Sequence, residues 1–175
     1  LLNVPQFYML EVGEKVLETP ERTVLLMTQF CILKSPDGKI FVMSGRDPES
    51  RSFHIQPYCR FVTWMCDGER KHILSTLPSF LSHSFEVFTR DNVNMKLGIR
   101  INYEIKNVDT FAANPIEFFS YLRNHAQNVL LDRFAGHTLR EFMASEGGLA
   151  KSSVTDCNKY FMSFGIAVLD IQMLE

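Results

Sequence analysis

The sequence has no long apolar run, and neither sign of charge is in excess. The longest apolar stretch, Val24 to Leu33, is interrupted by Thr28 and Gln29 and is much shorter than the roughly 20 residues of a membrane-spanning helix. Eighteen basic against twenty acidic side chains give a net charge of -2, which provides no basic footprint for nucleic acid or anionic lipid. We therefore expect no membrane span in these residues and no nucleic-acid partner.

Regular cysteine spacing and glycosylation acceptors are also missing. The four cysteines are irregularly placed, and no Asn-x-Ser/Thr sequence occurs. Both features are typical of a reduced, intracellular protein. Because the chain starts without Met and stops directly after a strand-like run, we expect it to be cut from a longer polypeptide, with targeting or anchoring segments elsewhere.

Common catalytic and cofactor-binding motifs are absent from the sequence. It contains no Gly-rich phosphate loop, no nucleophile elbow and no His-Glu-x-x-His helix. The best metal-ligating set, Cys59, Cys66 and His72, lacks both a fourth ligand and the roughly two- to four-residue spacing of zinc sites. We expect these cysteines to be buried as small apolar residues, and we predict no metal, no cofactor and no catalytic residue.

The remaining ionisable residues lack the partners that catalysis needs. Cys157 with His137 as base would make a nucleophile pair, but Cys157 belongs to the apolar stripe of a predicted helix, which favours a core position. His125 is interpreted as a surface or boundary residue. Asp91 is expected to cap a turn, and Asp170 has no second carboxylate at a spacing suited to acid–base work.

What the sequence does contain is ample core-forming material. Hydrophobic residues make up 46% of the 175 residues, and 15 of them are Phe. This composition is typical of a globular protein with one domain or two closely joined subdomains.

The first half is predicted to be a small antiparallel β subdomain over residues 1–84. The signals at Ser35-Pro36-Asp37-Gly38 and Asp67-Gly68 favour tight turns. Between such turns lie the expected strands, which are Phe7 to Val12, Arg22 to Leu33, Lys39 to Ser44, Ser52 to Ile55, Tyr58 to Cys66 and Arg70 to Leu74.

A long amphipathic strand is predicted from Val93 to Ile105. Apolar residues occupy every odd position, which places them on one face of a strand. Phe85 to Thr89 is expected to pair with it through the turn at Arg90-Asp91-Asn92. The polar residues on the opposite face that we regard as a candidate subunit-contact surface are Asn94, Lys96, Arg100, Asn102 and Glu104.

Three helices and a last strand are predicted to follow. Asn114-Pro115-Ile116-Glu117 is a capping box for a helix that ends at Gly136. Thr138 opens a short helix, and a third helix from Ala150 ends at Gly165, before a strand from Ile166 to Met173. The sequence therefore predicts an α+β fold in which residues 85–175 form an antiparallel sheet with helices packed on one face.

An aromatic pair at the start of the first helix adds one more candidate contact. Phe118 and Phe119 are adjacent and cannot point to one side of a helix. We expect one ring in the core and Phe119 available at a boundary, as an anchor for another subunit.

Several local sequences, in this order, resemble the stomatin/prohibitin/flotillin homology (SPFH, band 7) domain. Thr89-Arg90-Asp91-Asn92-Val93 resembles the turn before the long strand of that family, and Asn102-Tyr103-Glu104-Ile105 resembles the end of this strand. Thr138-Leu139-Arg140-Glu141-Phe142-Met143 resembles its short Thr-Leu helix, and Phe164-Gly165-Ile166-Ala167-Val168 resembles the element before its last strand. The likeness covers residues 20–173, although Arg-Ser precedes Phe53 where many members have Gly-Pro-Gly.

The resemblance implies a non-catalytic scaffold rather than an enzyme. Members of this family form rings or cages from identical or related subunits and associate with membranes, here through segments outside these residues. The shoulder domain of the major vault protein shares the fold, so a cytosolic cage particle is the alternative. A ligand- or peptide-binding module and an unrecognised hydrolase remain further alternatives.

Overall fold

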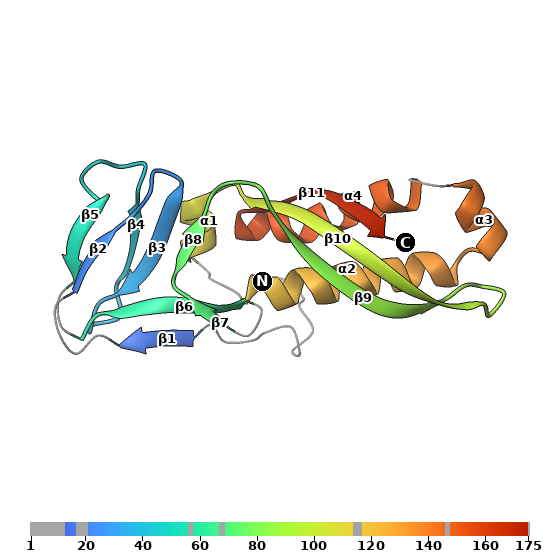
Figure 1. The fold of residues 1–175 in the computed structure, drawn as a ribbon, viewed down its shortest axis with the longest axis horizontal. Coiled ribbons are helices and arrows are strands. Elements are labelled where there is room, and N and C mark those ends of the chain that lie inside the picture. The colour runs from blue at the N-terminus through green and yellow to red at the C-terminus, as the bar shows by residue number, and fades with distance from the viewer. Residues whose placement is uncertain are drawn as a thin grey trace. The chain divides into compact units, whose positions relative to one another are not determined.

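The computed structural model describes residues 13–16, 21–55, 58–66, 69–113, 117–145 and 148–174 (Figure 1). The described residues form antiparallel sheets and four α-helices, which confirms the predicted α+β fold class. The chain divides into two compact units: Leu1–Leu77 with Ile105–Phe119, and Pro78–Glu104 with Ser120–Glu175. The two subdomains predicted from the sequence, residues 1–84 and 85–175, stay a prediction.

The first unit is built from short strands in antiparallel pairs, as the turn signals predict. One sheet has the order β1-β6-β3-β4, with β7 paired to β6 and β8 to β3, while β2 and β5 pair separately. Phe7 to Val12 and the Asp67-Gly68 turn lie outside the described residues. The elements are β1 (Gly13–Val16), β2 (Glu21–Val24), β3 (Gln29–Lys34), β4 (Ile40–Ser44), β5 (Ser52–Ile55), β6 (Arg60–Cys66), β7 (Glu69–Lys71), β8 (Ile73–Ser75) and the helix α1 (Val108–Ala113).

The single strand predicted from Arg22 to Leu33 is wrong, because a turn separates β2 from β3. The N–H of Leu26 donates to Oε1 of Gln29 (2.8 Å), and the N–H of Gln29 donates back to the carbonyl of Leu26 (2.9 Å). A Cβ on Gly45 would lie 1.8 Å from the carbonyl oxygen of Leu26. Distant residues also hold this turn, because the N–H groups of Gly45 and Thr76 donate to the carbonyls of Gln29 and Thr28 (both 2.8 Å). The turn residues themselves include no Gly or Pro that would have signalled it.

Aromatic side chains bring α1 onto the sheet of the first unit. The ring of Phe111 lies 6.1 Å from that of Phe30 and 5.6 Å from that of Trp64, and all three side chains are buried. The sequence pattern did not predict α1, although Asn107 caps it by accepting the N–H of Thr110 on Oδ1 (3.0 Å).

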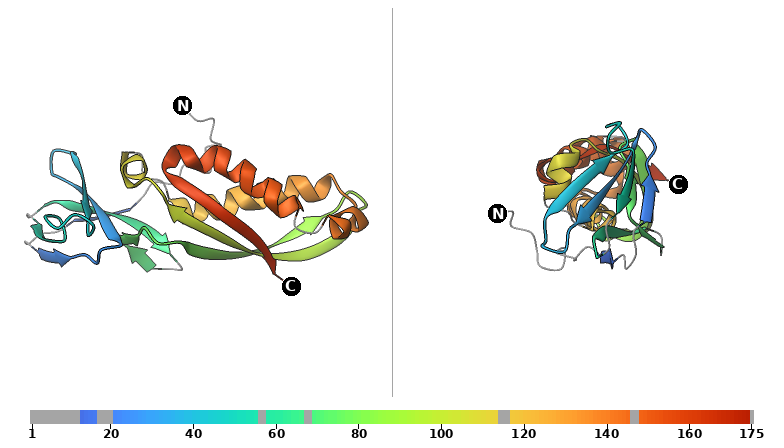
Figure 2. Two further views of the ribbon diagram at one scale, coloured as in Figure 1. Left: turned by 90° about the horizontal axis from the view of Figure 1, so that it is seen from above. Right: turned by 90° about the vertical axis from the view of Figure 1, so that its left-hand side faces the viewer.

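The second unit is a three-stranded sheet in the order β11-β10-β9, and Figure 2 shows helices on one of its faces. Its strands are β9 (Ser79–Phe88), β10 (Asn94–Ile105), whose last residue belongs to the first unit, and β11 (Ile166–Leu174). Its helices are α2 (Phe118–Ala135), α3 (Leu139–Ala144), α4 (Gly148–Phe161) and the 3₁₀ turn Met162–Phe164, with Phe118 and Phe119 in the first unit. The capping box predicted at Asn114-Pro115-Ile116 lies outside the described residues.

The alternation in β10 is confirmed. The odd-numbered residues from Leu97 to Ile105 are all buried, and Ile99 and Ile101 are 0% exposed. The even-numbered residues are exposed or half-buried. A period of two thus places the apolar side chains under the helices and the polar ones on the other face.

A side chain of α4 bonds the backbone of the last strand. Asn158 donates from Nδ2 to the carbonyl of Val168 (2.9 Å) and accepts the N–H of Val168 on Oδ1 (2.7 Å). Its carboxamide therefore takes the place of a neighbouring strand at this point of the β11 edge. Further along, a Cβ on Gly98 would lie 3.4 Å from Cβ of Leu174, so the absence of a side chain at Gly98 lets β11 come close to β10.

Candidate interaction surface

The sheet face opposite the helices carries both polar and aromatic side chains. We call it the outer face and define it by the even-numbered residues of β9 and β10, together with Asp170, Gln172 and Leu174 of β11. Phe80 is 51% exposed, Phe88 is 53% exposed and Leu174 is 47% exposed. Exposed apolar side chains set among polar ones are typical of protein contact surfaces.

Five of the six predicted contact residues lie on the outer face. Asn94 and Lys96 are exposed, and the other three, Arg100, Asn102 and Glu104, are half-buried. Whether they touch another subunit stays a prediction.

The sixth residue, Phe119, is not the exposed aromatic that the sequence predicts. Phe118 and Phe119 are 1% and 5% exposed. Their ring centroids are 4.1 Å apart, and Phe118 also packs edge-to-face on Phe111 at 5.5 Å. Both rings are buried because adjacent helix positions differ by about 100° around the axis and can share one wide apolar side.

An arginine stacked on an aromatic ring is the most specific feature of the outer face. Cζ of Arg100 lies 3.8 Å from the ring centroid of Phe80, a cation–π geometry. The register places Arg100 opposite Ser82 and Asn102 opposite Phe80, so the guanidinium reaches diagonally from β10 to β9. Among the described residues, Nε of Arg100 is buried and has no hydrogen-bond partner. The sequence pattern identifies Arg100 but not Phe80, because strand register is not readable from one strand alone.

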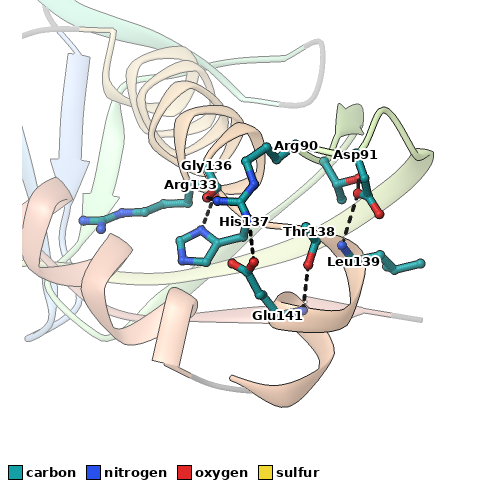
Figure 3. Close-up of polar contacts among 9 residues, drawn as sticks. Arg90, Asp91, Arg133, Gly136, His137, Thr138, Leu139 and Glu141 are labelled. Atoms are coloured by element: carbon teal, nitrogen blue, oxygen red, sulfur yellow. Dashed lines mark hydrogen bonds and ion pairs between the residues drawn. The ribbon is translucent and has the colours of Figure 1, made fainter.

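Two motifs that are far apart in the sequence meet at the end of the second unit (Figure 3). The turn after β9 contacts the connection between α2 and α3: the N–H of Arg90 donates to the carbonyl of His137 (2.8 Å), and its guanidinium pairs with Glu141 (2.5 Å). Asp91 accepts the N–H of Leu139 on Oδ1 (3.3 Å). The turn and the short helix thus hold each other in place.

Asp91 is a structural carboxylate. Its Oδ1 accepts the Thr89 hydroxyl (2.5 Å), and this bond to the charged form lowers the pKa of Asp91. Thr138 caps α3 by accepting the N–H of Glu141 on Oγ1 (3.2 Å), as the sequence predicts. The carboxylate of Asp91 thus bonds the Thr89 hydroxyl of its own turn and the backbone N–H of Leu139, which agrees with the interpretation of Asp91 as a turn cap.

The candidate nucleophile Cys157 is buried as an apolar residue. It is 1% exposed, and burial raises the pKa of its thiol to about 12, with a smaller contribution from the Asp156 carboxylate. A thiol with this pKa stays protonated and is a poor nucleophile. Nδ1 of His137, the proposed base, lies 2.7 Å from the carbonyl oxygen of Arg133 in its own helix region.

His125 is a boundary residue, as expected. Its ring stacks on that of Tyr160 (4.7 Å) and meets Phe161 edge-to-face (5.4 Å). Asp170 is exposed on β11.

No cluster of three or more His, Cys, Asp or Glu side chains suited to a metal occurs in the part of the chain that the structure describes. Cys59 is half-buried, the ring of His72 packs on Phe61 (4.3 Å), and the side chain of Cys66 lies outside the described residues. Of the helices in the described ranges, none has the length and apolarity to span a bilayer.

Comparison with known proteins agrees with the geometry of the second unit. The model of the family described as "SPFH domain / Band 7 family" matches residues 52–175. The match includes all of β9, β10 and β11 and the helices between them. No curated protein matches the chain. Since the family model covers well over half of the sequence, the chain belongs to the SPFH domain / Band 7 family.

Proposed function

We propose that this chain is a non-catalytic scaffold domain whose copies assemble side by side into a ring or cage associated with a membrane. The observation that carries the proposal is the outer face of the second unit. Helices cover the other face of the sheet, while this face exposes Phe80, Phe88 and Leu174 among charged groups. Aromatic residues and Arg are enriched where proteins contact one another.

Family membership supports this assignment at a coarser level. The SPFH family comprises stomatin-, prohibitin- and flotillin-like proteins that are commonly membrane-associated scaffolds. Membrane association would come from segments outside these residues. A vault-like cage in the cytosol is the outcome expected if the native particle carries no such segment.

Sedimentation velocity of the native full-length protein tests the assembly. We expect one large species with the mass of many subunits at micromolar concentration. Phe80→Ser should shift the distribution toward protomers, because it removes an exposed ring from the outer face. Phe41→Ser is a matched control, since Phe41 lies on β4 of the first unit and is exposed to a similar extent, 49% against 51%. A wild-type protein that remains monomeric at high micromolar concentration would end the scaffold proposal.

A further inference from the structure

The three-stranded sheet of the second unit has two edge strands, each with one side that no other strand of the sheet pairs with. The order β11-β10-β9 makes β9 and β11 its two edge strands. An edge strand presents unpaired N–H and C=O groups that can bond a strand from another chain. These two edges therefore lie on opposite sides of one sheet.

On β11, the backbone direction follows from the bonds of Val168. Both its N–H and its C=O bond Asn158, so they point away from β10. The alternation does not continue unbroken from Val168, because Leu169 and Asp170 are both exposed. Further along, Leu174 lies beside Gly98, and the even-numbered residues of β10 direct their backbone groups toward β11, since the odd-numbered ones bond β9. The backbone groups of Gln172 and Leu174 therefore face β10, whereas those of Ile171 and Met173 point outward, where the described residues of this sheet include no further strand. The edge of β11 is thus closed at Val168 and open at Ile171 and Met173.

On β9, the same reasoning uses the turn to β10. The N–H of Thr89 donates to the carbonyl of Val93 (3.1 Å), so the odd-numbered residues of β9 bond β10. The even-numbered residues, including Ser82 and Ser84, then have outward backbone groups, and their side chains are exposed. The β9 edge is open over most of its ten residues.

We propose that β11 of one copy pairs with β9 of the next copy, so that the sheet continues from subunit to subunit. This inference rests on the proposed assembly of the chain and specifies its contact. β9 runs antiparallel to β10, and in Figure 1 β11 also runs opposite to β10, so β9 and β11 are parallel. Copies placed side by side in the same orientation bring these two edges together in parallel, which is the head-to-tail contact that a ring requires.

Charge complementarity favours a second copy of this chain as the partner. Gly98 is opposite Ser84 on β9 and lies beside Leu174 on β11. Counting along the strands, Asp170 is then level with Phe80. In the register without stagger, Asp170 of one copy meets Phe80 of the next, where the guanidinium of Arg100 lies over the ring. The carboxylate would then lie beside the positively charged guanidinium of Arg100.

Two pairs of variants in the full-length protein test the contact by sedimentation. Met173→Pro removes an outward N–H of β11 without removing a bond to β10, because proline is tolerated on the free side of an edge strand; Met173→Ala keeps the N–H and is its control. Asp170→Lys reverses the charge at the junction, and Asp132→Lys makes the same change at an exposed position on α2. We expect Met173→Pro and Asp170→Lys to raise the concentration needed for half-assembly by at least roughly tenfold and both controls to assemble as wild type.

Amide hydrogen exchange provides a readout that requires no variant. We expect exchange at Ser82, Ser84, Ile171 and Met173 to slow when protomers assemble, because their N–H groups become bonded or shielded. Wild-type assembly that Asp170→Lys leaves unchanged, with unchanged exchange at both edges, would overturn the edge pairing and leave the scaffold proposal intact. A two-fold β9–β9 contact, seen as protection of Ser82 and Ser84 alone, would also overturn it. Failure of the wild type to assemble would instead contradict the proposed function itself.

Discussion

His125 shows how a single residue makes the second unit sensitive to pH. Its half-buried ring packs on Tyr160 and Phe161 of α4, and burial lowers the pKa of His125, partly offset by the Asp156 carboxylate. In the unfolded chain the imidazole has an ordinary pKa of about 6.5. Protonation therefore favours the unfolded chain.

The pH dependence of unfolding follows from the sign of this shift. The neutral ring of His125 makes its full contribution to the free energy of unfolding at a pH above the pKa of the imidazole in the unfolded chain. This contribution is lost as the pH falls through that pKa toward the lower pKa of His125 in the folded chain. We expect the melting temperature to fall between about pH 7.5 and about pH 5.5, and to fall less in His125→Phe, which keeps an aromatic ring between the helices. Equal slopes in the two proteins, measured by circular dichroism, would contradict this role of His125.

Residue-scale predictions from the sequence succeed where the interaction is local. The cap of Thr138 on Glu141 spans three residues and follows from helix-capping chemistry alone. By contrast, the bonds of Asn158 to Val168 and the stacking of Arg100 on Phe80 join separate elements. Such pairs depend on strand register and helix packing, which one sequence does not encode in any local pattern.

The amphipathic strand β10 makes the strongest prediction at the scale of an element. Ile101 is 0% exposed on the helix-facing side. Ile101→Asp should destabilise the chain by several kcal/mol, on the order of 3 to 5 or more, because it buries an unpaired charge. Asn94→Asp places the same carboxylate on an exposed position of this strand and should change stability little. Urea unfolding distinguishes them, and similar midpoints would show that the two faces of β10 are assigned incorrectly.

Helices and strands are predicted well from the sequence where their periodicity or capping is strong. They are predicted poorly where contacts with residues distant in the sequence determine the backbone conformation. The alternation of β10 and the 3.6-residue pattern of α4 meet the first condition. The turn between β2 and β3 meets the second, since its backbone lies against Gly45. α1 was missed because six residues show no period, and its one signal was the Asn107 cap.

At the scale of the whole molecule, the balanced charge argues against strong binding of these residues to lipid. Interfacial binding grows with buried apolar area and with attraction of basic groups to anionic lipids, and the net charge here is -2. We expect the 175-residue chain alone to remain in the non-floating fraction with neutral and with partly anionic vesicles. Flotation of the chain would instead indicate a membrane contact within these residues, for which the exposed Leu26 and Met27 are the first candidates for substitution by Ser.

The bond between Asn158 and Val168 has a consequence for how large an assembly can grow. If neighbouring sheets join at their edges, the side chain of Asn158 blocks the first part of β11 and limits how far one subunit can slide along another. A fixed offset decides between a closed circle and an open filament, because any constant slip per subunit accumulates into a helical rise. The carboxamide of Asn158 would then fix the offset between neighbouring subunits and keep successive subunits in one plane.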